Sequence, residues 1–246
     1  MSDLSNRYVV AVLSTFQGGP VDPGVMPTVL SSAAVEVLGV DGAGLSLVDS
    51  LRVPLGASGE EVRVAERLQT TLGEGPCLSA VETAAPLLAD TAAMVERWPL
   101  FARELMARTP FRSVVSLPLA WPDRRPFLAL DLYLEDATPD PALVDDPVRG
   151  DVTTVVSTLL SGAQLTQLHV EDAYAQVPWL AGESVQSRMN VWSAVGMLMA
   201  ASQLSQPEGL AVLRAHAFSQ GTTLDDVAHR LTSHQLPVDE VLQADG

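Results

Sequence analysis

The chain has 246 residues, enough for one large domain or two ordinary ones, and 47% of them are hydrophobic, which is enough for a substantial core. Its net charge is −16 and all 14 basic residues are arginine, which argues against general adhesion to nucleic acid or membranes, because both depend on basic patches. No run approaches the roughly 18 consecutive apolar residues of a membrane span, and the N-terminus has no signal-peptide pattern. We therefore expect a cytoplasmic protein with no membrane partner.

Cysteine and histidine usage limits the possible metal and cofactor sites. Cys77 is the only cysteine, which excludes an internal disulfide and a metal site built from cysteines alone. Residues 1–168 hold no histidine that could ligate haem iron or zinc, because all histidines lie in the last third of the chain. No metal and no cofactor is expected.

The N-terminal part begins with two expected helices and a hairpin. Apolar residues at helical spacing predict a helix over residues 3–16, which the Gln-Gly-Gly-Pro sequence at 17–20 ends. A second helix is predicted over residues 27–38, because proline is acceptable in the first turn. Two short apolar runs, 44–49 and 51–57, predict a β-hairpin.

A capping box and a glycine-rich turn follow the hairpin. The sequence Ser-Gly-Glu-Glu at 58–61 matches a capping box and predicts a helix over residues 59–71. The next motif, Leu-Gly-Glu-Gly-Pro-Cys at 72–77, predicts a tight turn before a helix over 78–82. Its glycines permit positive φ or close backbone approach, and the amides at the helix start could hold an anion. A purely structural loop is the alternative.

Strands and helices alternate in the remaining N-terminal pattern. We predict strands over 86–90, 113–119 and 127–134, a helix through Trp98 to Met106, a turn over 121–126 and a loop over 136–147. A long helix is predicted over residues 148–174, which Pro178 ends or kinks. This order of elements is typical of an α+β domain with an antiparallel sheet.

Four local motifs accompany this order. They are Gly-Glu-Gly-Pro-Cys at 73–77, Trp-Pro at 98–99, Arg-Ser at 112–113 before a strand that ends Leu-Pro-Leu, and Asp-Leu-Tyr-Leu at 131–134. Together they resemble the GAF sensory domain of actinobacterial GAF-ANTAR regulators, over about residues 5–170. The resemblance implies a GAF-like sensor domain, an antiparallel sheet with flanking helices, over residues 1–146. A connecting helix and kink would occupy residues 147–179.

The resemblance also implies where an unidentified small molecule would bind. The pocket would lie between the sheet and residues 72–98, with Glu74, Cys77, Trp98 and Arg112 as candidate wall residues. Their alternatives are an exposed acid, a buried thiol, a core indole and a surface base. A cysteine at a helix start can be reactive. However, a GAF-type methionine sulfoxide reductase relies on several cysteines, and a bilin-carrying domain commonly has histidine beside its cysteine, whereas Leu78 stands there.

The C-terminal part centres on an amphipathic stretch over residues 188–199, Arg-Met-Asn-Val-Trp-Ser-Ala-Val-Gly-Met-Leu-Met. Apolar residues at 185, 189, 192, 195 and 199 recur at steps of three or four and predict a helix, and Val191 and Leu198 widen the stripe. Gly196 lies inside this helix, where glycine costs roughly 1 kcal/mol relative to alanine. It indicates either the close approach of another helix or a position without structural meaning.

The order Arg-x-x-Val-x-x-Ala-x-Gly-Met-Leu-Met resembles the first helix of the ANTAR domain, a three-helix RNA-binding module of bacterial antitermination regulators. The sequence that follows fits as well, over about residues 180–238. The resemblance implies an all-α ANTAR-like module over residues 180–241, with its second helix near Ser205 and its third near Thr222. The expected core residues of the module are Val191, Ala194, Gly196, Leu198, Met199, Leu213, Ala217 and Ala228.

Three arginines, Arg188, Arg214 and Arg230, would lie one on each helix of this module. Arginine can grip phosphate and stack on bases, so these are the candidate RNA-binding residues, with ordinary solvated arginines as the alternative. The chain departs from many ANTAR domains at two positions: Val195 stands where lysine is common, and Gly209 where alanine is usual. The first change removes a positive charge and favours packing or dimerisation.

No Walker-type loop, zinc-ligand spacing or HExxH run appears, so no enzymatic activity is expected. The two resemblances predict a signal-responsive transcription antitermination regulator that binds RNA hairpins under the control of its sensor domain. They also imply a homodimer, with the 148–174 helix near the interface, and no DNA partner. The alternative is a dimeric sensor or protein-interaction module that has lost RNA binding.

Overall fold

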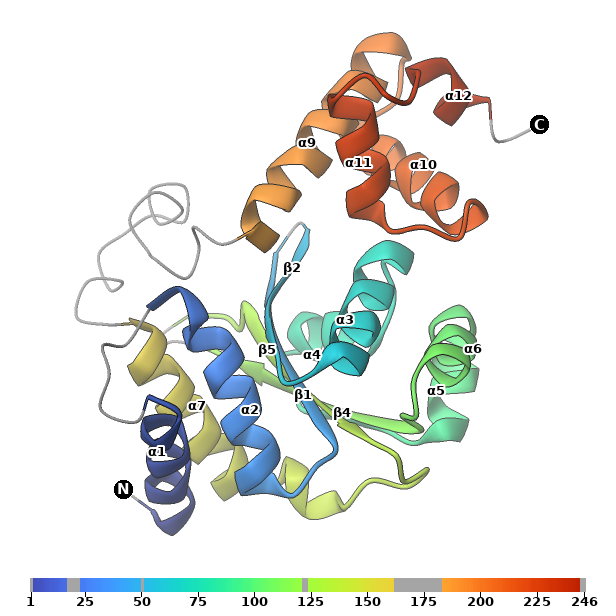
Figure 1. Cartoon of the computed structure of the whole chain (residues 1–246). Coiled ribbons are helices and arrows are strands. Elements are labelled where there is room, and N and C mark those ends of the chain that lie inside the picture. Colours follow the sequence, from blue (N-terminus) through green and yellow to red (C-terminus); the bar gives the residue numbers. More distant parts are fainter. Residues whose placement is uncertain (1, 17–22, 50, 121–123, 162–182, 244–246) are drawn as a thin grey trace.

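The computed structural model describes residues 2–16, 23–49, 51–120, 124–161 and 183–243 (Figure 1). These residues form an α+β domain, called here the N-terminal domain (2–161), and a helical C-terminal module (183–243). The predicted fold class, an antiparallel-sheet domain followed by an all-α module, is confirmed. The domain boundaries stay predictions, and the predicted helix beyond residue 161 lies outside the described residues, as does the turn at 17–20.

A five-stranded sheet forms the centre of the N-terminal domain. Its strands are β1 (Gly42–Val48), β2 (Arg52–Ala57), β3 (Leu87–Ala89), β4 (Ser113–Leu119) and β5 (Leu128–Leu134). They pair in the order β2-β1-β5-β4-β3, and each neighbouring pair is antiparallel. β1, β4 and β5 are buried along their whole length, which explains why they are short, nearly continuous apolar runs in the sequence.

The two faces of the sheet differ in chemistry because side chains alternate along each strand. Leu128, Leu130 and Leu132 of β5 belong to an apolar core. Three helices cover that face: α1 (Asp3–Thr15), α2 (Met26–Leu38) and α7 (Asp146–Ser161) (Figure 1). The intervening residues Asp131 and Tyr133 face the other side, where α3 (Glu60–Leu72) and α4 (Pro76–Thr83) pack.

Two more helices extend this second layer, α5 (Thr91–Arg97) and α6 (Pro99–Arg108). Trp98 ends α5 in a non-helical conformation, and Pro99 then opens α6. Short 3₁₀ helices occupy η1 (Pro23–Val25) and η2 (Pro141–Val144). The loop predicted over residues 136–147 is therefore only partly correct, because it contains η2 and the start of α7.

The C-terminal module consists of α9 (Glu183–Ala201), α10 (Gln206–Ser219), α11 (Leu224–Thr232) and a short fourth helix, α12 (Val238–Leu242). Capping boxes begin α10 at Ser205 and α11 at Thr223, which confirms the predicted helix starts. The Ser205 N–H donates to Glu208 at 2.8 Å, and the Asp226 N–H donates to the Thr223 hydroxyl at 3.1 Å. Six predicted core residues are fully buried: Val191, Ala194, Leu198, Leu213, Ala217 and Ala228.

Two of the predicted core positions are wrong. Gly196 is exposed, and among the described residues nothing from another element lies within 4 Å of the position that its Cβ would take, so no described helix approaches there. Met199 is 38% exposed. The face of α9 that packs contains Val191, Ala194 and Leu198, and Gly196 and Met199 lie on the opposite face.

The predicted capping box at residues 58–61 is also wrong. Gly59 is the N-cap residue of α3, and no side chain caps it. The Ser58 hydroxyl instead accepts from the Ala43 N–H at 3.0 Å, and the Ser58 N–H donates to the Ala43 carbonyl at 2.9 Å. Pairing with β1 has thus replaced the local cap.

Candidate functional site

Polar side chains are buried between the sheet and helices α3 and α4, where the sequence places the ligand pocket. Arg52, at the start of β2, is at the centre and is 1% exposed. Its Nη2 donates to Glu66 Oε2 at 2.6 Å and to Asp131 Oδ2 at 3.2 Å, and its Nη1 donates to the Glu66 carbonyl at 2.7 Å. The Cys77 sulfur accepts from Nε at 2.8 Å. One guanidinium therefore joins two carboxylates and a thiol.

Neutral side chains satisfy the remaining carboxylate oxygens. Tyr133 and Ser46 each donate to Glu66 at 2.6 Å, Gln69 donates to Asp131 at 2.7 Å, and Ser116 also donates to Asp131. We call this set the buried polar cluster: Ser46, Arg52, Glu66, Gln69, Cys77, Ser116, Asp131 and Tyr133. Its side chains pack closely against the sheet, because a Cβ on Gly44 would lie 2.5 Å from the Glu66 side chain. Whether a ligand binds between the sheet and residues 72–98 stays a prediction.

Burial controls protonation in the buried polar cluster. Removal from water raises the pKa of Asp131 to about 7, the nearby Glu66 carboxylate adds to the rise, and Arg52 opposes it. Burial also raises the pKa of the Cys77 thiol well above its usual range. Cys77 is therefore a neutral, inaccessible thiol and lacks the environment of an activated nucleophile.

The other predicted wall residues have structural contacts. Glu74 accepts from the Phe101 N–H at 2.9 Å and thereby caps the start of α6. Trp98 is 6% exposed and lies in the apolar cluster of the second layer. Arg112 donates to two neighbouring backbone carbonyls, at 2.7 and 3.0 Å. Contact of these residues with a ligand stays a prediction.

The three candidate RNA-binding arginines lie one on each helix, as predicted, but in different surroundings. Arg188 on α9 is 5% exposed, and its Nη2 donates to Asp225 of α11. Arg214 on α10 lies against the backbone where α3 ends: a Cβ on Gly73, whose φ is +70°, would be 2.5 Å from Arg214 Nη1. Arg230 on α11 is exposed. Where the module meets the N-terminal domain, Arg188 is therefore buried and Arg214 is partly covered.

The module docks on the β1–β2 hairpin and on α3 (Figure 1). Leu51, between the two strands, is 4% exposed and belongs to the hydrophobic core of the module. The Leu224 N–H at the start of α11 donates to Thr71 Oγ1 of α3 at 3.3 Å. The Arg103 guanidinium of α6 lies 5.8 Å from the centre of the Phe218 ring of α10. These contacts define the domain interface.

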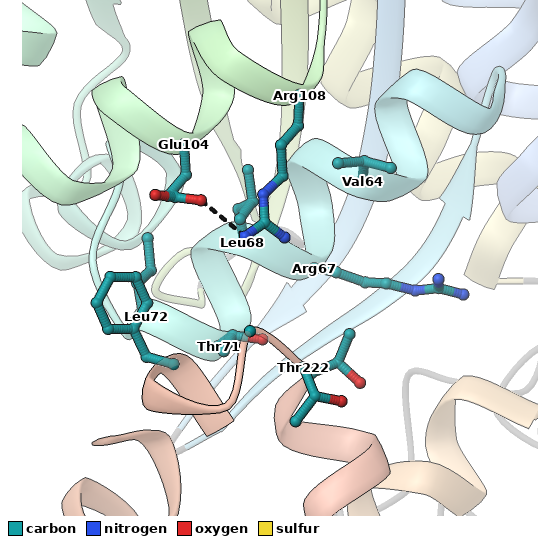
Figure 2. Close-up of a pocket in the computed structure, with 11 residues that line it drawn as sticks. Val64, Arg67, Leu68, Thr71, Leu72, Glu104, Arg108 and Thr222 are labelled. Atoms are coloured by element: carbon teal, nitrogen blue, oxygen red, sulfur yellow. Dashed lines mark ion pairs between the residues drawn. The ribbon is translucent and has the colours of Figure 1, made fainter. Parts of the chain in front are cut away.

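The described residues of the domain interface line a smaller and a larger cleft. The smaller, of about 110 Å³, has the Arg108–Glu104 ion pair on one side, with an N–O distance of 2.7 Å, and Thr222 of the module on the other (Figure 2). The larger, of about 380 Å³, lies between β2 and α3 on one side and α9 and α11 on the other. Both Arg67 and Arg188 line it. Only the larger cleft reaches the size of a typical small-molecule site.

The chain differs from many ANTAR domains at Val195 and Gly209, and these two residues contact each other. Val195 is 1% exposed, and its Cγ1 would lie 3.3 Å from a Cβ at position 209. The missing methyl group at Gly209 therefore makes room for the valine side chain between α9 and α10. Val195 therefore contributes to the packing of α9 against α10.

Residues 181–231 match the ANTAR domain family. The match covers nearly all of α9 to α11, so the docked helical module contains an ANTAR domain, and an α+β domain with an antiparallel sheet between helices precedes it. No curated protein matches the chain.

The chain is also similar to solved structures. It is 12% identical to the GAF domain of a phosphoenolpyruvate-protein phosphotransferase from Coxiella burnetii, with a TM-score of 0.47, over 71% of this chain and 98% of that chain. The corresponding Acinetobacter domain is 13% identical, with a TM-score of 0.46 and the same coverage. A free methionine-R-sulfoxide reductase from Neisseria meningitidis is 18% identical, with a TM-score of 0.43, over 65% and 91% of the two chains.

Sequence reasoning missed the buried polar cluster, although a signal for it exists. Asp131 interrupts the apolar run Leu-Ala-Leu-Asp-Leu-Tyr-Leu, and Arg52 begins an apolar strand. A charge on a buried strand requires a partner, so these two residues could have been paired. No comparable signal marks Leu51 or Arg67 as interface residues.

The described residues contain no candidate metal site and no membrane-spanning helix. Within residues 2–16, 23–49, 51–120, 124–161 and 183–243, no group of three or more His, Cys, Asp and Glu side chains is arranged so that it could hold a metal ion. Among the helices of the same ranges, none has the length and apolarity needed to cross a bilayer.

Proposed function

We propose that this protein is a signal-responsive transcription antitermination regulator, whose ANTAR domain binds RNA hairpins under the control of the GAF-like domain. The observation that carries the proposal is the placement of the arginines: Arg188 is buried and Arg214 is partly covered at the domain interface, whereas Arg230 is exposed. A guanidinium that binds a phosphate must reach the surface. The docked arrangement is therefore the state of low RNA affinity, and release of the module exposes the two covered arginines.

The balance of contacts at the domain interface suits such a switch. Arg188 Nε and Nη1, Arg214 Nε and Asp225 Oδ1 are buried and have no hydrogen-bond partner among the described residues. Leaving such a group unpaired costs about 1–3 kcal/mol, which favours release. Burial of Leu51 opposes release by about 1.5–3 kcal/mol. Docking therefore combines contributions of opposite sign, so a signal that changes either one would shift the equilibrium between the docked and released states.

We also propose that the regulator is a homodimer, because recognition of paired hairpins requires two modules. An exposed apolar face on α9 supports this proposal. Met189 is 59% exposed and Met199 is 38% exposed, and helical spacing places both on the side of Gly196. Unpartnered apolar surface of this kind is typical of association sites.

RNA binding across a salt series tests the proposed function. The full chain should bind a hairpin RNA more tightly than a scrambled RNA of equal length at each salt concentration. Arg230→Gln should weaken binding and lower the salt slope by about 1, because one phosphate contact is lost. Arg7→Gln, at an exposed arginine of α1, is the matched control. Equal affinity for both RNAs throughout would refute the proposal and favour a dimeric sensor or protein-interaction module.

A further inference from the structure

The larger cleft of the domain interface, called here the interdomain cleft, is lined by three arginines and by three acidic residues, Glu66, Asp225 and Asp226. It is lined by the edge of β2, by α3, by α9 and by the first turn of α11. Three of the chain's 14 arginines, Arg63, Arg67 and Arg188, line a space of about 380 Å³. Arg63 pairs with Glu60 at 2.7 Å and Glu66 pairs with Arg52 at 2.6 Å, which leaves Arg67, Arg188 and the two aspartates as the charged residues to consider in this cleft.

Arg67 and Arg188 both have unused donors. Arg67 is exposed and forms no hydrogen bond or ion pair within the described part of the chain, and Figure 2 shows its side chain extending away from the Arg108–Glu104 pair. The Arg188 side chain is 6% exposed and uses only Nη2, toward Asp225. Burial lowers the pKa of Arg188, Asp225 opposes this change, and the charges of Arg52 and Arg67 add to it, so Arg67 repels the Arg188 guanidinium.

Asp225 also lines the interdomain cleft, and one of its carboxylate oxygens lacks a hydrogen-bond donor within the described part of the chain. Its Oδ1 is buried and has no partner among the described residues. The neighbouring Asp226 is already engaged, because it accepts from the Thr223 hydroxyl at 2.6 Å and from the Thr222 hydroxyl at 3.1 Å. A matching ligand needs an anionic group for the two guanidiniums and a hydrogen-bond donor for Asp225.

We propose that the interdomain cleft binds a small anionic metabolite, a carboxylate or a phosphate ester that also carries a hydroxyl or amino group. Its anionic group bridges Arg67 and Arg188, and its donor reaches Asp225. The bridge relieves the repulsion between the guanidiniums and satisfies groups that docking leaves unpaired. The cleft has the volume of a metabolite site.

Regulation follows from the position of the site, and this step rests on the proposed function. The interdomain cleft exists only while the module is docked, because each domain supplies one wall. A ligand that binds only the docked state stabilises that state and opposes RNA binding. At a ligand concentration of about 100 times its Kd, RNA affinity would fall by up to about 100-fold.

Calorimetric titration of the full chain with 3-phosphoglycerate, malate and sulfate, at constant ionic strength, tests the site. We expect at least one organic anion to bind the wild-type chain and the Arg7→Gln control, and to bind about 10-fold or more weakly to Arg67→Gln. The better of the two organic anions distinguishes a phosphate ester from a carboxylate. Sulfate, which lacks a donor, should bind more weakly than that anion. Equal binding by Arg67→Gln and Arg7→Gln, or no binding of either organic anion, would overturn the proposal.

RNA binding measured with and without the bound anion separates the two proposals. Arg67-dependent anion binding in a chain that binds no hairpin RNA would leave the site standing and refute the proposed function. Hairpin binding that a saturating anion does not weaken would refute the regulatory role of the cleft and leave the proposed function standing.

Discussion

The substitution Asp131→Asn tests the electrostatics of the buried polar cluster. Asp131 is fully buried, and burial raises its pKa to about 7 from an ordinary value of 3.8. Between these two values the folded protein holds a proton that the unfolded chain has lost. Stability is therefore highest on the acidic side of this window and falls as the pH rises toward 7.

The expected size follows from the same two values. One pKa unit corresponds to about 1.4 kcal/mol, so the free energy of unfolding should fall by about 4 kcal/mol between pH 4 and 7. Asparagine has the same shape and does not titrate, so Asp131→Asn should lack this fall. Ser116, which donates to Asp131, can rotate its hydroxyl to accept from the new amide. The variant should therefore gain stability relative to the wild type as the pH rises.

Urea unfolding followed by circular dichroism, at half-unit steps from pH 4.5 to 8, measures this difference. Asp3→Asn, at a carboxylate that is 93% exposed, controls for the change of net charge. The reasoning is refuted if wild-type stability is constant or rises between pH 5 and 7, or if Asp131→Asn keeps the wild-type slope.

Three further predictions concern packing and reactivity. Gly196→Ala should raise the free energy of unfolding by up to about 1 kcal/mol, because the position is helical and open; a loss of stability in urea would contradict its exposure. Gly209→Ala should raise the free energy of unfolding by less than Gly196→Ala does, or should lower it, because the new methyl group meets Val195. Val195→Ala in the same chain should restore the gain, and additive effects in a double-mutant cycle would show that the two residues do not interact. Cys77 should react with a thiol reagent only as fast as the protein unfolds, and rapid labelling of the native protein would show an accessible thiol.

The helices and strands of the N-terminal domain could be predicted because the spacing of apolar residues in the sequence agrees with their burial in the structure. In β5, leucines at every second position face the apolar core, and the pattern alone identifies a strand. The start of α10 was equally readable, because Ser205 and Glu208 form a complete capping box. Ser58 shows the limit of such local signals, because pairing with β1 competes for the same hydroxyl.

The packing face of α9 could not be read from the sequence, because the helix is apolar on two sides. One side carries Val191 and Leu198, and the other carries Met189 and Met199. Helical spacing fits either side, and only the positions of α10 and α11 decide between them. The domain interface could not be predicted for a related reason. The burial of Leu51 depends on how the two domains pack together, and no local sequence pattern determines that.

The affinity of the full chain for a hairpin RNA, measured with the variant Leu51→Asp, tests most directly whether docking withholds the RNA-binding arginines. The aspartate would place a charge in the module's core, so small-angle scattering should show release of the module. Loss of the leucine contact alone weakens docking by about 1.5–3 kcal/mol, so RNA affinity should rise by about 10-fold or more over the wild type. Leu13→Asp, at a leucine that is 60% exposed on α1, should leave affinity unchanged. A released module with unchanged or lower affinity for the hairpin would contradict control by docking.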